Sequence, residues 1–139
     1  SIAELCAADH RNDPAILARW LGNKTVENVR RWIAEAGNSV LVAVEADQIV
    51  AVGSVTDAGR IGLNYVSPAA RFRGVSRAML HALETRAALR GNGRCTLDST
   101  ATARRFYRDA GYVETGPPAG AFGTDSAYPM VKALAPRQR

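Results

Sequence analysis

The residues from Arg71 to Ser76 have the composition of an anion-binding loop. The run Arg71-Phe72-Arg73-Gly74-Val75-Ser76 lies between a predicted strand and a predicted helix. Free backbone N–H groups and partial positive charge make the N-terminus of a helix favourable for phosphate. Gly74 lets the backbone approach a ligand closely, and Ser76 is small enough not to block it. The pattern predicts a phosphate cradle, and the alternative is a solvated basic turn.

Positive charge is concentrated in the same part of the chain. The net charge of the whole sequence is +5, but residues 71–108 hold nine basic and two acidic residues, a net +7. Residues 1–70 carry a net −2, and residues 109–139 are neutral. This excess fits a ligand with several phosphates. It also fits a nucleic acid, although the sequence has no recognition-helix signature and no exposed aromatic platform, so nucleic acid is the less favoured partner.

The composition limits the other classes of protein. At 139 residues with 47% hydrophobic residues, the chain is expected to form a single domain over residues 1–139. No apolar run approaches the ~20 residues of a membrane span, and no secretory leader is recognisable, so a cytoplasmic protein is expected. Two cysteines and two histidines are too few for a disulfide framework or a zinc site, and no metal is expected.

The elements that must position the cradle follow from periodicity and turn signals. Helical signals dominate the first 37 residues, with starts at Ser1, Asp13 and Thr25 and a stop at Gly37. β-Branched runs then predict an antiparallel meander over residues 40–44, 49–55 and 61–66. The residues after the meander predict a helix from Val75 to near Gly91, a strand at 95–97 with a parallel neighbour, and a helix over 101–110. A strand at 112–113, a loop over 116–124 and a last strand over 127–134 follow.

Two motifs in this order resemble those of the GNAT superfamily of acyl-CoA-dependent N-acyltransferases. The run from Arg71 to Ser76 is similar to the family's Gln/Arg-x-x-Gly-x-Gly/Ala signature, with serine in the last position. The second match is Thr100-x-x-Ala103-x-x-Phe106-Tyr107-x-x-x-Gly111-Tyr112, where the family has Asn-x-x-Ala-x-x-Phe-Tyr-x-x-x-Gly-Phe. The resemblance covers roughly residues 40–134. It implies an α/β fold with a mixed, mostly antiparallel sheet flanked by helices, and a chain that lacks the family's first strand.

The resemblance also implies how acetyl-CoA binds. The backbone amides of the cradle would hold the coenzyme A pyrophosphate, and the pantetheine would run beside the strand over residues 61–66. A backbone N–H of Tyr65 or Val66 would polarise the thioester carbonyl. The coenzyme-binding residues implied in this way are Tyr65, Val66, Arg71, Phe72, Arg73, Gly74, Val75, Ser76, Thr100 and Ala103.

Candidates for proton transfer are fewer. Tyr107 matches the family tyrosine that often protonates the coenzyme A sulfur, and a phenol with a pKa of ~10 is close in acidity to a thiol. Its alternative is a packing residue with a surface hydroxyl. Many members place a glutamate on the fourth strand, where this chain has Asn64, which cannot accept a proton. Asp98, next to Ser99, could hold a relaying water, although an N-cap or turn carboxylate is the favoured alternative for it.

The leading hypothesis is an N-acetyltransferase that moves an acetyl group from acetyl-CoA to a primary amine within a ternary complex. The acceptor would be a small molecule or a protein, bound by residues 10–36 and 116–126. Arg104, Arg105 and Arg108 could contact the coenzyme 3′-phosphate, an acidic acceptor or only water. The alternatives are a nucleic-acid-binding module and a non-catalytic acyl-CoA sensor, the latter suggested by the missing carboxylate. A homodimer is a reasonable expectation.

Overall fold

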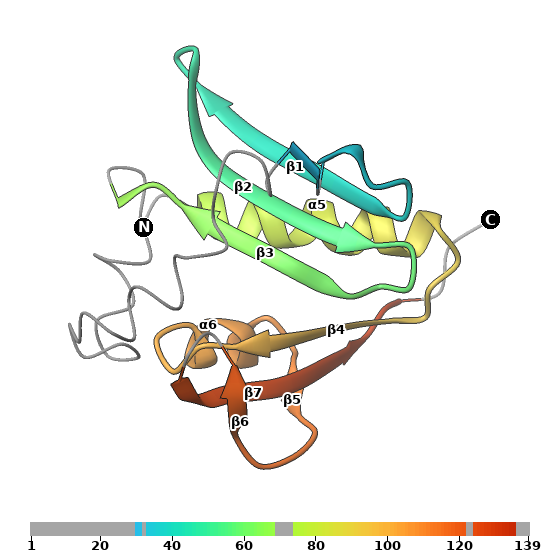
Figure 1. Ribbon diagram of the computed structural model, residues 1–139, viewed down its shortest axis with the longest axis vertical. Coiled ribbons are helices and arrows are strands. Elements are labelled where there is room, and N and C mark those ends of the chain that lie inside the picture. Colours follow the sequence, from blue (N-terminus) through green and yellow to red (C-terminus); the bar gives the residue numbers. More distant parts are fainter. Residues whose placement is uncertain (1–29, 32, 69–73, 122–123, 136–139) are drawn as a thin grey trace.

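A computed structural model describes residues 30–31, 33–68, 74–121 and 124–135 of the chain (Figure 1). The helices predicted to begin at Ser1 and Asp13 lie outside these residues, and so do Arg71–Arg73 of the predicted cradle. The prediction that the family's first strand is missing also concerns residues outside the described part of the chain. The end of the third predicted helix is described. Residues 30, 31, 33 and 34 are helical and a turn follows at 36–37, which confirms the stop at Gly37.

The first sheet is the predicted antiparallel meander. Its strands are β1 (Asn38–Glu45), β2 (Gln48–Thr56) and β3 (Ile61–Val66), in the order β1-β2-β3. The turn between β1 and β2 consists of Ala46 and Asp47, whose φ angles are 50° and 62°. Two consecutive left-handed residues match the right-handed twist of a hairpin. β2 is the central strand, so it carries the contacts to both neighbours.

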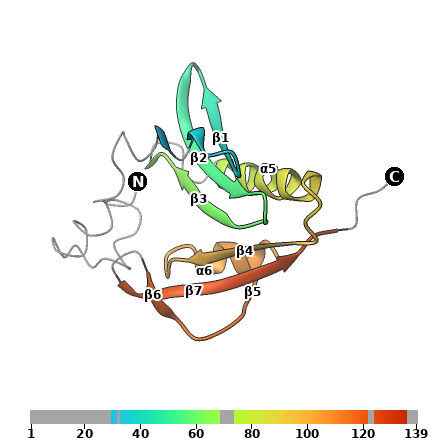
Figure 2. The ribbon, with the colours of Figure 1, turned by 45° about the vertical axis from the view of Figure 1, so that its right-hand side comes forward.

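The helix α5 (Val75–Leu89) packs along one face of this sheet (Figures 1 and 2). It buries Met79, Leu80, Leu83 and Ala87. Gly53 of β2 makes the close approach possible, because a methyl group there would lie 2.7 Å from Met79 Sδ and 2.9 Å from Leu83 Cδ1. The helix ends before Gly91, whose φ of 90° is left-handed, and the Asn92 N–H donates to the Ala87 carbonyl at 3.1 Å.

The second sheet is built from the C-terminal part of the chain. Its strands are β4 (Arg94–Ser99), β5 (Val113–Glu114), β6 (Ala119–Ala121) and β7 (Thr124–Ala133), in the order β4-β7-β5 with β6 on β7. The short helix α6 (Arg104–Asp109) lies between β4 and β5 in sequence. It is shorter than the predicted helix over 101–110, because residues 101–103 form a turn.

One prediction about this sheet is confirmed in part, and another is corrected. β4 was expected to have a parallel neighbour, and it does make a parallel bridge to the first sheet between Arg60 and Thr96, although its full-length partner is the antiparallel strand β7. The ten-residue β7 satisfies one edge of β4, while β3 diverges from the other. The segment 116–124 was expected to be a loop, but residues 119–121 form β6 and fold back on β7 as a hairpin.

A common core joins the two sheets and α5. Its members come from both halves of the chain and include residues with no measurable exposure, namely Leu83, Ala87 and Cys95, together with Leu97, Tyr107, Tyr112 and Met130. The predicted fold class is confirmed, since antiparallel strands dominate and helices flank them. Across the described ranges, no helix has both the length and the apolar character that crossing a membrane requires.

We predict that Gly53→Ala destabilises the protein by about 1–3 kcal/mol, because the new methyl group must displace Met79 or α5. Gly37→Ala is the matched control, since a methyl group at Gly37 meets no atom within 4 Å. The free energy of unfolding from urea titration measures both. Equal stability of the two variants would show that α5 does not pack on β2 as closely as described.

Candidate active site

The candidate site is the gap between β3 and β4. The two strands run in the same direction and separate toward their C-terminal ends (Figures 1 and 2). Thr96 N–H donates to the Gly59 carbonyl at 3.0 Å beside the single bridge, and the described strands form no ladder beyond that point. The far edge of β3 therefore presents backbone groups toward the gap rather than toward a neighbouring strand.

The backbone alternation of β3 decides which groups face the gap. Along an antiparallel strand, residues that hydrogen-bond to the neighbour alternate with residues whose N–H and C=O point away from it. Ser67 N–H donates to the Val50 carbonyl at 2.7 Å, so it faces β2. Val66, paired with Ala51, is one residue earlier and faces the gap, whereas Tyr65 faces β2. Of the two predicted carbonyl donors, Val66 has the suitable orientation.

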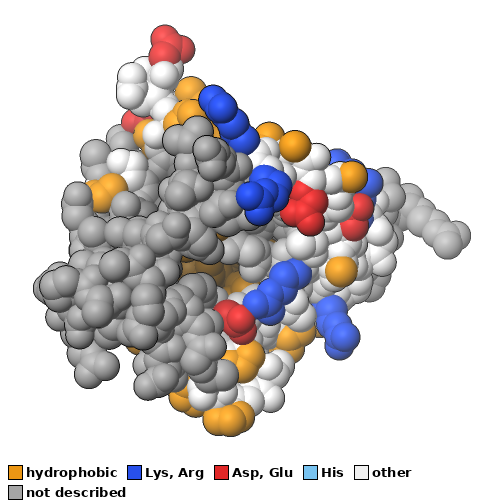
Figure 3. All heavy atoms as spheres, viewed as in Figure 1, with side chains coloured by type: hydrophobic (Ala, Val, Ile, Leu, Met, Phe, Trp, Pro, Cys, Tyr) orange, Lys and Arg blue, Asp and Glu red, His pale blue; other side chains and the backbone are white. Residues whose placement is uncertain are grey.

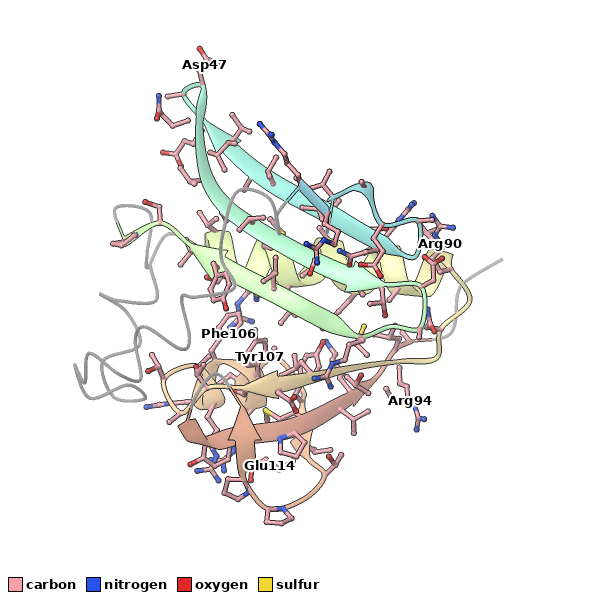
Figure 4. The ribbon with its side chains drawn as sticks, viewed as in Figure 1. Asp47, Arg90, Arg94, Phe106, Tyr107 and Glu114 are labelled. Carbon is pink, nitrogen blue, oxygen red and sulfur yellow. The ribbon has the colours of Figure 1, made fainter. Side chains whose placement is uncertain are left out.

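Tyr107 of α6 lies at this gap and is 7% exposed. Its ring packs edge-on against Phe106 at 5.1 Å and Tyr112 at 5.6 Å between centroids. Its hydroxyl accepts a hydrogen bond from Asn64 Nδ2 at 3.2 Å. Figure 4 shows Phe106 and Tyr107 between the two sheets. The alternative of a surface hydroxyl is therefore wrong, and the phenol is a buried group that faces β3.

Burial also determines the protonation of this phenol. Desolvation raises the pKa of Tyr107 to about 12, the hydrogen bond from Asn64 lowers it, and Tyr65 nearby adds a smaller increase. Because its pKa is above the ordinary value of about 10, the phenol keeps its proton throughout the neutral and mildly alkaline range. A group that keeps its proton in this way is in its acid form at neutral pH, as a proton donor must be.

Asp98 lies on the face of β4 that points away from the buried core. Cys95 and Leu97 of the same strand are buried, and Asp98 alternates with them. Its Oδ2 accepts a hydrogen bond from Arg60 Nη2 at 2.6 Å. The favoured alternative for Asp98, an N-cap or turn carboxylate, is therefore wrong, because the residue belongs to a strand and is held in an ion pair. The Ser99 hydroxyl donates to the Thr100 carbonyl at 2.8 Å.

Thr100 and Ala103 contact each other. The Ala103 N–H donates to Thr100 Oγ1 at 3.1 Å, which caps the turn that leads into α6. Ala103 also packs against the core. In this structure the two residues orient α6, and through it Tyr107.

The N-terminus of α5 opens onto a groove. Gly74 precedes the helix in the left-handed region, with φ of 75°, and no side chain of the described residues caps it. A methyl group at Gly74 would meet no atom of the described residues within 4 Å. The groove, called here the α5 groove, has a volume of about 540 Å³ and is lined by Gly74, Arg77, Ala78, Leu80, His81, Glu84, Ala110 and Lys132.

A polar network at the end of this groove was not anticipated from the sequence. Glu84 of α5 accepts hydrogen bonds from the Tyr112 hydroxyl at 2.8 Å and from Lys132 Nζ at 2.9 Å. Desolvation raises the pKa of the neighbouring Cys95 thiol to about 11, and the charge of Glu84 adds to this increase. The signal that could have indicated the network is Tyr112, which carries a hydroxyl where the family has phenylalanine.

Local pairs use much of the positive charge that the sequence concentrates in residues 71–108. Glu114 accepts hydrogen bonds from Arg104 and Arg108, and this lowers its pKa. Arg90 pairs with Asp57. Figure 3 shows basic and acidic side chains interspersed on one face of the molecule. Among the described residues, several arginines of this stretch are therefore paired locally, and Arg77 lines the α5 groove.

The fold, with its two diverging strands, the helix that follows β3 and the buried phenol of α6, is that of an acyl-transferring domain. A family model described as an acetyltransferase (GNAT) domain matches residues 7–134. The chain therefore belongs to the GNAT acetyltransferase family, and it is an acyltransferase. This favours the enzyme hypothesis over the nucleic-acid-binding and sensor alternatives.

Solved structures support the fold. A GCN5-related N-acetyltransferase from Rhodopseudomonas palustris is 24% identical, with a TM-score of 0.80 over 96% of this chain and 83% of that one. PaiA N-acetyltransferase from Thermoplasma acidophilum, in complex with coenzyme A, is 13% identical, with a TM-score of 0.77 over 94% and 87%. An aminoglycoside 6′-N-acetyltransferase complexed with coenzyme A is 18% identical, with a TM-score of 0.70 over 93% and 96%. A search of curated proteins finds no match.

We predict that Tyr107→Phe makes stability less sensitive to alkaline pH. The folded state holds the phenol proton to about pH 12, whereas the unfolded chain releases it near 10. Between these values the folded state binds more protons, so its stability falls as pH rises. The melting temperature of the wild type should therefore fall more steeply than that of the variant between pH 10 and 12, as followed by circular dichroism. Parallel curves would contradict the burial of this phenol.

Proposed function

We propose that the protein transfers an acetyl group from acetyl-CoA to a primary amine, with both substrates bound at once. The observation that carries the proposal is a pair of donors beside β3: the Val66 N–H, which points from the strand toward the gap, and the Tyr107 hydroxyl, which is hydrogen-bonded to Asn64 two residues earlier on the same strand. Acyl transfer needs a donor to the carbonyl oxygen and a proton for the leaving thiolate. The two groups are of the right kinds for these tasks.

The α5 groove and the N-terminus of α5 are proposed to bind the nucleotide end of the coenzyme. The first-turn N–H groups of Val75 and Ser76 are available to phosphate, and Arg77 adds positive charge within the same groove. Two proteins of this fold are described in complex with coenzyme A. In this arrangement the pantetheine arm would use the backbone groups along the open edge of β3, which pair with no described strand beyond the bridge.

The reaction then follows from the two donors. The Val66 N–H would stabilise the negative charge that develops on the carbonyl oxygen when the amine nitrogen forms its bond to the acetyl carbon. As the carbon–sulfur bond breaks, Tyr107 would give its proton to the sulfur. The proton lost by the attacking nitrogen would go to solvent and return to the phenolate. Val66 contributes only its backbone, so its side-chain type can vary.

Asp98 is proposed only as an indirect participant. Its carboxylate lies on the face of β4 away from the buried core and is paired with Arg60, so it would receive a proton through water. An amine that arrives neutral needs no such base. A hollow of about 320 Å³ beside the end of β3 offers space for the apolar part of an acceptor, and it is lined by Ile49, Val50, Ala51, Val52, Tyr65, Val66, Ser67 and Pro68.

We predict that Arg77→Ala weakens acetyl-CoA binding about threefold to fivefold, which is the loss of one partly solvated charge contact of about 1 kcal/mol. Arg94→Ala removes an exposed arginine that is outside the groove (Figure 4) and should leave the dissociation constant unchanged. Isothermal titration measures both variants. S-acetylpantetheine, which lacks the nucleotide, should bind Arg77→Ala and the wild type with the same dissociation constant. An absence of acetyl-CoA binding at millimolar concentration would refute the proposal.

We predict that Tyr107→Phe lowers kcat about 100-fold or more and leaves the KM for acetyl-CoA nearly unchanged, because the hydroxyl acts on the leaving thiolate and not on the bound thioester. The assay follows release of free coenzyme A thiol with a panel of primary amines. Tyr128→Phe, which removes a phenol from β7, is the matched control. An unchanged kcat in Tyr107→Phe would remove the assigned role of this residue.

A further inference from the structure

Asn64 makes a side-chain hydrogen bond between β3 and α6. It pairs in register with Gly53, and a side chain at Gly53 would point at Met79 and Leu83 of α5. Directly opposed residues of an antiparallel pair share a face, so Asn64 projects into the buried layer on the α5 side. There its Nδ2 donates to the Tyr107 hydroxyl at 3.2 Å. Its Oδ1 is buried and has no partner among the described residues.

We propose that Asn64 is a positioning residue for Tyr107, and that its Oδ1 accepts a hydrogen bond from an N–H group of a bound substrate. The inference rests on the proposed function. The substrate N–H belongs either to an amide of the pantetheine arm or to the acceptor amine, and both are donors of the same kind.

The first half follows from the donor and acceptor capacity of a phenol. A tyrosine hydroxyl has one proton to donate and lone pairs that accept. Asn64 Nδ2 can only donate, so it occupies a lone pair and leaves the phenol proton unused. No described residue accepts that proton. Asn64 therefore holds the ring in place while the proton remains available for the sulfur.

An asparagine is better suited to this task than a carboxylate. A carboxylate at position 64 would accept the phenol proton in a strong charge-assisted hydrogen bond and would keep it from the sulfur. Asn64 does not ionise, so its donor faces Tyr107 at every pH. The absence of a carboxylate at position 64 is therefore consistent with a site in which Tyr107 acts as the acid.

The second half follows from the unpaired oxygen. Nearly all buried polar atoms in proteins have a hydrogen-bond partner, and an exception needs an explanation. Asn64 Oδ1 lies on the side chain that already contacts the proposed acid, so it is near the reacting groups. Both candidate substrates carry N–H groups that could serve as the missing donor.

The test is a double-mutant cycle in kcat with Asn64→Leu, Tyr107→Phe and the combined variant. Leucine has nearly the shape of asparagine and removes both polar atoms. We expect Asn64→Leu to lower kcat at least tenfold in the wild-type background and less than about twofold in the Tyr107→Phe background, because the positioning effect requires the hydroxyl. An equal fold-loss in both backgrounds, or no loss, would overturn the positioning role.

Asn64→Asp supplies a second readout. At neutral pH the new carboxylate should accept the phenol proton and lower kcat, and kcat should recover as the pH falls and the carboxyl group becomes protonated and can donate. The titratable groups nearest the pair are Tyr65 on β3, Tyr112 before β5 with its partner Glu84 on α5, and Cys95 on β4. A profile parallel to that of the wild type would count against the proposal.

If Asn64→Asp does not fold, the alkaline absorbance titration of the tyrosines in Asn64→Leu replaces it. Loss of the hydrogen bond should raise the pKa of Tyr107, and an unchanged titration would overturn the contact. The KM values identify the donor to Oδ1: a rise for acetyl-CoA in Asn64→Leu indicates a pantetheine amide, and a rise for the amine indicates the acceptor. Unchanged KM values for both would overturn the second half of the proposal.

The outcome also separates this inference from the proposed function. A wild-type protein that binds no acetyl-CoA and acetylates no amine would overturn both. A wild type that is active and is impaired by Tyr107→Phe, together with Asn64 variants that behave like the wild type, would overturn only the inference.

Discussion

The site depends on an interruption of backbone hydrogen bonding between β3 and β4. A strand edge carries a row of N–H and C=O groups that need partners, and sheets normally satisfy them with another strand. Here one bridge at Arg60 and Thr96 starts such a ladder, and divergence ends it. No described strand pairs with the rest of this edge of β3, and the Val66 N–H points away from β2 toward the gap. The open edge on which the proposed binding of the pantetheine arm depends is therefore a property of the fold itself.

Side-chain contacts join the two sides of the gap on both of its faces. Arg60 and Asp98 form an ion pair on the more exposed face, where such a pair contributes about 0–1 kcal/mol. Asn64 and Tyr107 meet on the buried face. The rigid part of this arrangement is the core beneath it, because Tyr107 packs between Phe106 and Tyr112 and cannot move without disturbing them. Packing, and not the ion pair, fixes the separation.

Local signals predicted the elements well, and long-range pairing was harder to predict. β3 was expected at residues 61–66 and lies there, because Gly59 and Pro68 delimit it. α5 was expected between Gly74 and Gly91 for the same reason. The sequence of β4 does not indicate that β7 is its antiparallel partner, because the two strands are more than 20 residues apart in the chain. The Arg60–Asp98 and Asn64–Tyr107 contacts join residues 38 and 43 positions apart, beyond any periodic pattern.

The three-membered contact of Glu84 with Tyr112 and Lys132 has a consequence for how this sequence can diverge. Only 12% of the Glu84 side chain is exposed, and its two oxygens are satisfied by one hydroxyl and one ammonium group. Loss of Tyr112 or Lys132 alone leaves one oxygen of the mostly buried Glu84 carboxylate without its partner. Loss of Glu84 alone leaves the buried Tyr112 hydroxyl without its hydrogen-bond acceptor. Descendants of this chain should therefore exchange the three residues as a set, so that an apolar residue at position 84 accompanies phenylalanine at position 112.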